Sequence, residues 1–208
     1  MMERAGITVV PMGDNYAYLL PRGEGRCLVI DPGEASPVLA ALGQRGLVPQ
    51  AVFLTHGHAD HADGVAALRA AFPGLPVFCG PGGRAGTVIP DGAALPLSGA
   101  SLCVLHTPGH SADSACLAAG DDLFTGDTLF GAGCGRVFTR DFGAMFRSLE
   151  RLGALLPRTR LWFGHEYTLD NLEFAALVEP GNPALADYRA RVMAAGGCSV
   201  PGSLAEEL

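Results

Sequence analysis

The sequence contains no lysine, because all fourteen of its basic residues are arginine. A mechanism that needs a lysine Schiff base is therefore excluded. The formal net charge of −7 excludes the basic surface that unaided nucleic-acid binding requires, so we expect no nucleic-acid partner. Charged residues make up only 17% of the chain and hydrophobic residues 49%, which excludes a disordered protein and indicates one sizeable domain with a large core.

Long apolar segments are absent too. No run approaches the roughly 18 apolar residues of a membrane span, so we expect no membrane association. The N-terminal sequence MMERAGITVV has no cationic segment followed by an apolar stretch, which predicts that there is no signal peptide. The six cysteines are scattered without a C-x-x-C pair. Together these features predict a cytoplasmic protein with reduced thiols.

Short apolar runs bounded by Gly, Pro, Asp or Asn dominate the first part of the chain and predict strands. Helical patterns interrupt them at ASPVLAALGQRG, where we expect Ser36 as the N-cap and Gly43 or Gly46 as the stop, and at ADGVAALRAAFPG. After Asp141 the helical patterns take over, apart from one last strand in LWFGHEYT. This order predicts a layered α/β or α+β domain that ends in a small helical cap.

The segment THGHADHADG, residues 55–64, holds three of the six histidines within six residues. Side chains alternate along the preceding strand AVFL, so His56 and His58 point to the same side, and Asp60 and His61 follow at the start of a helix. Imidazole and carboxylate ligands together suit Zn(II), Fe or Mn. The alternative is a solvated loop with helix-capping residues, which four ligand-type residues at this spacing disfavour.

Three more ligand-type residues, His110, Asp127 and His165, come directly after predicted strands, where a rigid sheet can orient a loop residue. We interpret His106 as a structural or supporting residue. Five histidines and two aspartates are too many for one four-coordinate metal, and they suit two metals that share a bridging carboxylate. Two metals ~3.5–4 Å apart would lower the pKa of a bridging water, orient the hydroxide and stabilise the oxyanion of the tetrahedral intermediate.

Two other kinds of site remain as alternatives at this point. PGHSADS places Ser111 and Ser114 near the predicted site, but the chain has no G-x-S-x-G motif to present a nucleophilic serine. A purely structural metal site would be a closed four-ligand cage, whereas the residues here imply an open position. A hydrolytic metal centre is therefore the leading interpretation.

With these residues the chain resembles the metallo-β-lactamase superfamily, whose pattern is H-x-H-x-D-H followed by His, Asp and His. GDTLFGAGCGRVF and GHEYTLDNLEFA are similar to two signature segments of its glyoxalase II (hydroxyacylglutathione hydrolase) family. The resemblance implies an α+β fold, a four-layer αββα sandwich with the metals at one edge. It also implies a catalytic domain over residues 1–172 and a short helical C-terminal extension over residues 173–208, truncated relative to typical members.

The resemblance also implies a role for each candidate residue. One metal would be held by His56, His58 and His110, and the other by Asp60, His61 and His165, with Asp127 bridging them. Asp60 and Asp127 would be the catalytic carboxylates. Asp31 in VIDPG would support the ligand loops, although a simple turn residue before Pro32 explains it equally well. The substrate contacts would come from Cys134, Gly135, Arg136, Phe138 and Tyr167, and Phe138 lacks the hydroxyl of the tyrosine that is frequent in the family.

The implied cofactors are two divalent metal ions, with zinc as the first candidate and iron or manganese as alternatives. The implied reaction is hydrolysis of a small-molecule glutathione thioester, S-D-lactoylglutathione or a similar hydroxyacyl thioester, to D-lactate and the free thiol. The attacking group would be a hydroxide that bridges the two metals. The alternatives are a persulfide dioxygenase with one Fe(II), a hydrolase for another thioester, and a β-lactamase or lactonase. The oligomeric state does not follow from the sequence.

Overall fold

Two β-sheets packed face to face form the middle of the protein in the computed structural model, which describes residues 2–4 and 6–208. The first sheet holds, in order, β1 (Met2–Arg4), β2 (Ile7–Met12), β3 (Asn15–Pro21), β4 (Arg26–Ile30), β5 (Val48–Leu54), β6 (Val77–Cys79) and β7 (Thr87–Val88). The second holds β14 (Gly202–Ser203), β13 (Arg160–Phe163), β10 (Asp122–Gly126), β9 (Ala115–Ala119) and β8 (Cys103–His106). A separate ribbon pairs β11 (Leu129–Phe130) with β12 (Gly133–Cys134).

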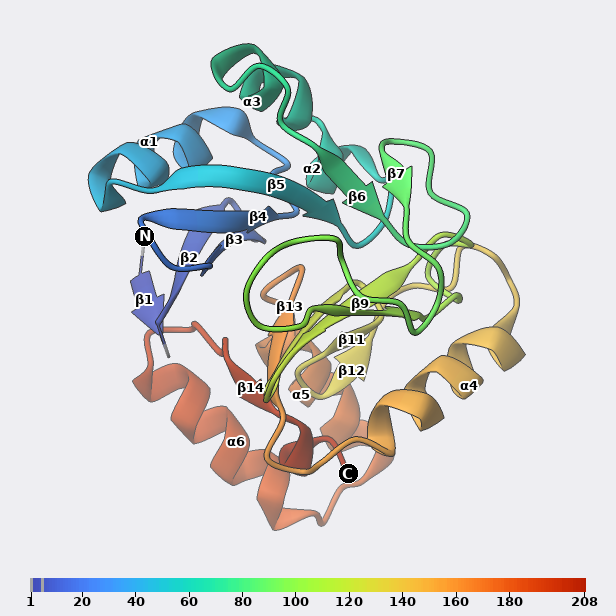
Figure 1. Ribbon diagram of the computed structural model, residues 1–208. Coiled ribbons are helices and arrows are strands. Elements are labelled where there is room, and N and C mark those ends of the chain that lie inside the picture. Colours follow the sequence, from blue (N-terminus) through green and yellow to red (C-terminus); the bar gives the residue numbers. More distant parts are fainter. Residues whose placement is uncertain (1, 5) are drawn as a thin grey trace.

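Helices form the two outer layers (Figure 1). The first sheet is covered by α1 (Ala35–Arg45), α2 (Ala59–Ala62) and α3 (Val65–Ala71). On the other side lie α4 (Phe142–Gly153), α5 (Thr168–Val178), α6 (Pro183–Ala194) and the short 3-10 helix η1 (Leu204–Glu206). The predicted four-layer αββα arrangement is confirmed. Among the residues that the structure describes, no helix is both long and apolar enough to span a bilayer.

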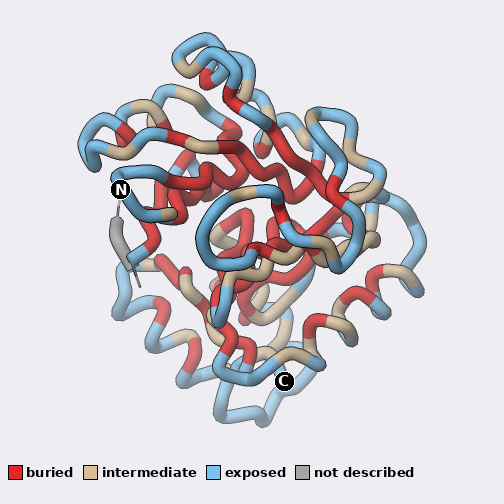
Figure 2. Tube along the Cα trace, in the orientation of Figure 1, coloured by how far each residue is buried: buried red, intermediate tan, exposed pale blue. Residues whose placement is uncertain are grey.

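The core is divided by the first sheet, and Figure 2 shows the buried chain concentrated along the strands. Between the two sheets lie the largest fully buried side chains, among them Tyr18, Phe124 and Trp162, whose rings pack against one another. Between the first sheet and its helices a second cluster includes Leu42 of α1 and Leu68 of α3. Because both faces of the first sheet are buried, its central strands β4 and β5 are mostly apolar, as is typical of parallel strands covered by helices.

Helix α1 begins at Ala35 with Glu34 at the N-cap, so the prediction of Ser36 as the N-cap was wrong. Ser36 and Pro37 both lie in the first turn, where backbone N–H groups have no partner within the helix, so the sequence is compatible with either start. The stop at Gly46 is confirmed, because this residue is left-handed with a φ of 61° and ends the helix.

The C-terminal region returns to the second sheet, so LWF is not the last strand. Gly202 of β14 pairs with Leu161 of β13. The predicted division between residues 172 and 173 falls within α5 and stays a prediction.

A buried carboxylate ties two strands of the second sheet together. Asp122 accepts hydrogen bonds from Nε and Nη2 of Arg160, both at 2.7 Å, and from Nε1 of the fully buried Trp162 at 2.8 Å. Asp122→Ala leaves the indole N–H unpaired, so we expect it to lower the free energy of unfolding by about 2–3 kcal/mol in chemical denaturation. The control is Asp121→Ala, which removes an exposed ion pair with Arg158 and is expected to cost under about 0.5 kcal/mol. Equal effects of the two substitutions would contradict this assignment.

Glu207 joins the C-terminal turn to the β11–β12 ribbon, because it accepts a hydrogen bond from the Ala132 backbone N–H at 2.8 Å. Burial raises the pKa of Glu207 to about 7 from its ordinary value of 4.5. Its stabilising contribution is therefore fully present below pH 4.5 and is lost as the pH rises through 7. Glu207→Gln does not ionise, so we expect it to escape this loss. As the pH rises from 4.5 to 8, its free energy of unfolding should increase relative to that of wild type by up to about 3 kcal/mol. Urea denaturation at both pH values measures this, with the exposed Glu173→Gln as a control that should show no such gain.

Candidate metal centre

The candidate ligands lie where the carboxyl ends of parallel strands reach one edge of the sandwich. In the first sheet β4 and β5 are parallel, and the Asp31 N–H donates to the Phe53 carbonyl at 3.1 Å, so Asp31 lies beside the loop that follows β5. In the second sheet β10 and β13 are parallel with Gly126 opposite Phe163, so Asp127 and His165 leave the sheet as neighbours. The Ala115 N–H donates to the Thr55 carbonyl at 2.8 Å and joins the two sheets at this edge.

All seven predicted ligands converge here. Their donor atoms form three groups, each with atoms within 4.8 Å of one another: His56, His58 and His110; His56, His61 and Asp127; and Asp60, His61 and His165. The prediction of a strand-to-helix corner is confirmed, since Asp60 and His61 lie in α2 directly after the β5 loop. Among the described residues, His106 is in none of these groups and lies 3.1 Å, through its Nε2, from the Ala112 carbonyl.

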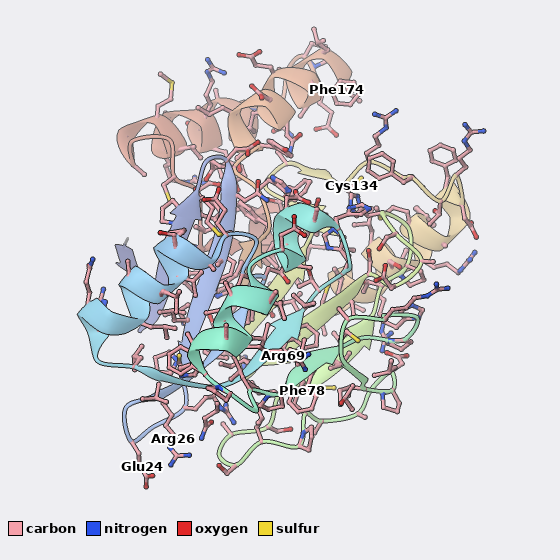
Figure 3. All side chains as sticks on the ribbon, turned by 90° about the horizontal axis from the view of Figure 1, so that it is seen from above. Glu24, Arg26, Arg69, Phe78, Cys134 and Phe174 are labelled. Atoms are coloured by element: carbon pink, nitrogen blue, oxygen red, sulfur yellow. The ribbon has the colours of Figure 1, made fainter. Side chains whose placement is uncertain are left out.

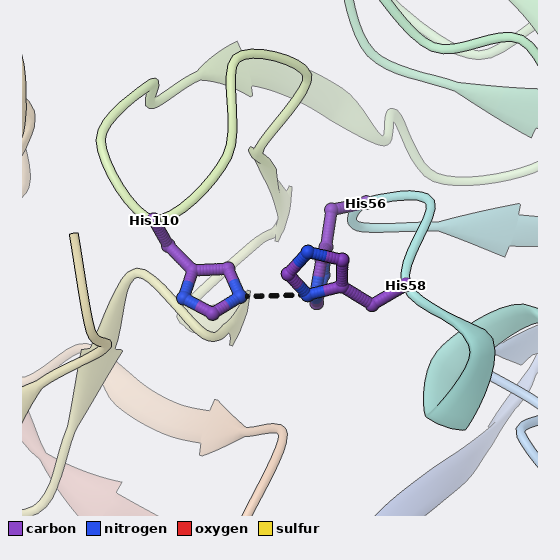
Figure 4. Close-up of side chains that lie close together, drawn as sticks. All are labelled: His56, His58 and His110. Carbon is purple, nitrogen blue, oxygen red and sulfur yellow. Dashed lines mark hydrogen bonds between the residues drawn. The ribbon is translucent and has the colours of Figure 1, made fainter. Parts of the chain in front are cut away.

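The first group consists of three imidazoles aimed at one point (Figure 4). Nδ1 of His58 lies 3.0 Å from Nε2 of His56 and 3.0 Å from Nε2 of His110. Burial lowers the pKa of His56 to about 3 and also lowers that of His110, which keeps both rings in the neutral form that ligates metals. Nδ1 of His110 lies 2.9 Å from the Arg136 carbonyl, which leaves its Nε2 free to act as a ligand.

The group of Asp60, His61 and His165, called the second group from here on, combines imidazole with carboxylate. Oδ2 of Asp60 lies 3.3 Å from Nε2 of His165 and 3.7 Å from Nε2 of His61. Behind His61, Oδ2 of Asp31 lies 3.0 Å from Nδ1. Burial favours the neutral ring, but the carboxylates of Asp31 and Asp127 outweigh it and raise the pKa of His61 to about 10. Ligation through Nε2 must therefore displace a proton.

Asp127 lies between the two groups. Its Oδ1 is 3.3 Å from Nε2 of His61, and its Oδ2 is 3.4 Å from Nε2 of both His110 and His165. Burial opposes ionisation, yet the neighbouring imidazoles of His165 and His61 hold the pKa of Asp127 well below its usual range. Within the described part of the chain its buried Oδ1 has no hydrogen-bond partner. A buried carboxylate oxygen left unpaired beside imidazole nitrogens fits a divalent cation at this place.

Two supporting residues hold the ligand loops. Asp31 accepts from the Thr55 backbone N–H at 2.8 Å and from the Thr55 hydroxyl at 2.6 Å, in addition to its contact with His61. The sequence had indicated Asp31 only as a position that could equally be a turn residue. Asn15 was missed altogether: its Nδ2 donates to the backbone carbonyl and to Oδ2 of Asp60, at 3.0 and 3.1 Å. No local signal marked Asn15, because its partner lies 45 residues away in the sequence.

A cavity of about 540 Å³ opens onto these ligands, and four of the five predicted substrate contacts line it: Gly135, Arg136, Phe138 and Tyr167. The Arg136 guanidinium lies over the Phe138 ring, 5.1 Å from its centre, and the Tyr167 ring stacks on His165 at 4.8 Å. Cys134 lines a different cavity, of about 530 Å³, together with Phe174, and both lie on the same side of the molecule in Figure 3. Cys134 is the last residue of β12, and the residues that line the first cavity, from Gly135 onwards, lie beyond the end of this strand.

Two parts of the chain match known protein families. Residues 11–86 match the family described as "Metallo-beta-lactamase superfamily", and residues 166–208 match "Hydroxyacylglutathione hydrolase C-terminus". The chain is 40% identical over 190 residues to the hydroxyacylglutathione hydrolase of Yersinia pestis (strain Pestoides F), which covers 89% of this chain and 75% of that one.

Two solved structures are also similar. The BLEG-1 B3 metallo-beta-lactamase has a TM-score of 0.69 at 27% identity, covering 76% of this chain and 91% of that one. TTHA1623, solved in a di-iron-bound form, has a TM-score of 0.64 at 36% identity with the same two coverages.

Proposed function

The chain belongs to the hydroxyacylglutathione hydrolase family of the metallo-β-lactamase superfamily, and from this premise we propose how its site works. It is a metal-dependent thioester hydrolase of glyoxalase II type, and its substrate is a small molecule. S-D-lactoylglutathione, or a similar hydroxyacyl thioester, is the substrate that we propose. The family and the Arg136 guanidinium beside the cavity support this choice, because the glutathione part carries carboxylates.

The observation that carries the proposal is the position of Asp127 between two separate sets of donors. We assign His56, His58 and His110 to one divalent metal and Asp60, His61 and His165 to the other, with Asp127 shared. When bound, two such metals would supply an activated water and positive charge for the developing oxyanion. Asp31, Asn15 and the Arg136 carbonyl hold the ligands in place from behind, which preorganises the site.

The residues of the cavity would bind and orient the thioester. Phe138 and Tyr167 form apolar walls on either side of the ligands, since the Phe138 ring packs on His58 and His110 and the Tyr167 ring on His165. The C–S bond of the thioester breaks, the carbonyl carbon gains the hydroxyl of water, and the sulfur leaves as a thiol. Because Phe138 has no hydroxyl, we assign recognition of the carrier's carboxylates to Arg136.

Zinc is the metal that we propose first, because a set of imidazole and carboxylate donors suits it, with iron or manganese as alternatives. The di-iron form of the 36% identical TTHA1623 supports two metals and keeps iron among the candidates. A cytoplasmic location is also part of the proposal, and the six free thiols support it. Elemental analysis of purified protein identifies the metal, and two equivalents per chain are expected.

The test is a substrate panel on protein of defined metal content: S-D-lactoylglutathione, other acyl-glutathiones, thioesters of other thiols, and glutathione persulfide with oxygen uptake. We expect hydrolysis of the hydroxyacyl-glutathione. Preference for another thiol would change the carrier and leave the reaction as proposed. Oxygen uptake with the persulfide on one Fe(II) would instead favour the dioxygenase, and a protein inert with two metals bound would refute the hydrolase.

A further inference from the structure

Glu166, which directly follows the candidate ligand His165, is the centre of a hydrogen-bond network. Its Oε2 accepts from the Tyr16 hydroxyl at 2.9 Å and from the Ser199 backbone N–H at 2.7 Å. Its Oε1 accepts from the Ser199 hydroxyl at 2.7 Å. Both carboxylate oxygens are therefore used inside the protein, by groups from β3 and from the segment before β14.

The backbone on both sides of His165 is held by the first part of β3 and the residue before it. The Tyr16 N–H donates to the Gly164 carbonyl at 2.9 Å, and the Glu166 N–H donates to the Asp14 carbonyl at 2.9 Å. Burial raises the pKa of Tyr16, so its hydroxyl stays a neutral donor. The backbone that carries the His165 ring is therefore held on both sides.

The first ligand group has no part in this network. His56 and His110 are supported by the Thr55 hydroxyl and the Arg136 carbonyl, and neither contact involves β3 or the C-terminal segment. The second group depends on the start of β3 twice, because Asn15 binds Asp60 and the adjacent Tyr16 binds Glu166. The two groups are thus supported by different parts of the chain.

We propose that Glu166 is a positioning residue that sets the metal affinity of the Asp60–His61–His165 group, and that the C-terminal segment controls the occupancy of this group through Ser199. The His56–His58–His110 group does not depend on it. This inference rests on the two-metal site of the proposed function. Loss of a supporting hydrogen bond behind a metal ligand typically weakens metal binding about 10–100-fold, which is the size of the effect expected here.

The experiment measures the Zn²⁺ affinity of metal-free full-length chain by competition with a chromophoric chelator. In a His58→Ala background, which disables the first group, we expect Tyr16→Phe, Glu166→Ala and Ser199→Ala each to weaken binding at least about 10-fold. In a His165→Ala background, which disables the second group, the same three substitutions should leave the affinity within about twofold. Glu166→Gln, which keeps one acceptor, should lose less than Glu166→Ala.

Tyr188→Phe is the matched control, because it removes another buried tyrosine hydroxyl, one that donates to Glu207 and not to Glu166. It should leave Zn²⁺ affinity unchanged in both backgrounds. Each background keeps one ligand group intact, and Zn²⁺ binding at the first group in the His165→Ala background reports that a variant is folded. A variant that loses all Zn²⁺ binding in both backgrounds is misfolded. The test then rests on Tyr16→Phe alone.

The outcomes separate this inference from the function on which it rests. Equal weakening in both backgrounds, or no weakening in either, overturns the positioning role even if wild type hydrolyses thioesters. Wild-type protein that binds a single Zn²⁺ overturns the two-metal site and this inference together. Wild-type protein could also bind two Zn²⁺ ions, and the variants could show the expected selective loss of Zn²⁺ affinity, without any thioester hydrolysis. That outcome overturns the function and leaves the positioning role supported.

Discussion

Asp127→Asn is expected to lower kcat for thioester hydrolysis by more than about 100-fold, because the loss of a mere supporting contact already costs 10–100-fold. The substitution keeps the shape of the side chain but removes the negative charge that lies within 3.4 Å of His61, His110 and His165. Both ligand groups lose a shared donor at once, so elemental analysis should show fewer than two metals per chain. Steady-state kinetics on metal-loaded protein measure the loss of turnover.

The matched control is Asp63→Asn in the same histidine-rich segment. Asp63 is exposed at the end of α2 and belongs to none of the ligand groups. We expect its kcat and metal content to stay within about twofold of wild type, since exposed substitutions away from a site have small effects. Full turnover in Asp127→Asn at normal metal content would contradict the shared role of this carboxylate.

Removal of the metals by a chelator should reduce hydrolysis below about 1% of the starting rate and lower the thermal unfolding temperature. The donors converge only in the folded chain, so a metal binds the native state and not the unfolded one. Zn²⁺ added back to 100 times its dissociation constant should stabilise the protein by about 2.7 kcal/mol for each site filled. Circular dichroism melts with and without Zn²⁺ measure the stabilisation, and the thioester assay measures the return of activity.

Asp127→Asn serves again as the control for the metal experiment, because its weakened sites should show a smaller shift on the same addition of Zn²⁺. Restoration of both activity and unfolding temperature by Zn²⁺ distinguishes metal loss from irreversible damage by the chelator. Metal-free protein that hydrolyses the thioester at the original rate would refute a metal-dependent mechanism.

Most of the ligand set could be recognised in the sequence because its main part is local. His56, His58, Asp60 and His61 lie in one strand-to-helix corner between the end of β5 and α2, so their spacing is visible in the sequence. The exits of the later strands marked His110, Asp127 and His165 as candidates. The layered fold followed from the alternation of strand and helix patterns. The N-cap of α1 did not, because the sequence is compatible with more than one first residue of this helix.

The substrate side could be predicted only in part. Gly135, Arg136 and Phe138 line the cavity beside the ligands, but the adjacent Cys134 lines another one. Sequence proximity does not tell which way each side chain faces, since that depends on how the β11–β12 ribbon lies against the rest of the protein.

The tertiary structure alone decides how the ligand sets are held and joined. Asn15 reaches Asp60 across 45 residues of sequence, and Tyr16 reaches Glu166 across 150. Such pairs leave no periodic signal, because they form between segments that are distant in the sequence. Residue types and local spacing were therefore sufficient for a layered fold and for the candidate ligands, and the resemblance of the signature segments was sufficient for the family. The resemblance had already implied a shared position for Asp127. The separate support of the two ligand groups required the folded chain, because contacts between distant segments form only once both sheets are in place.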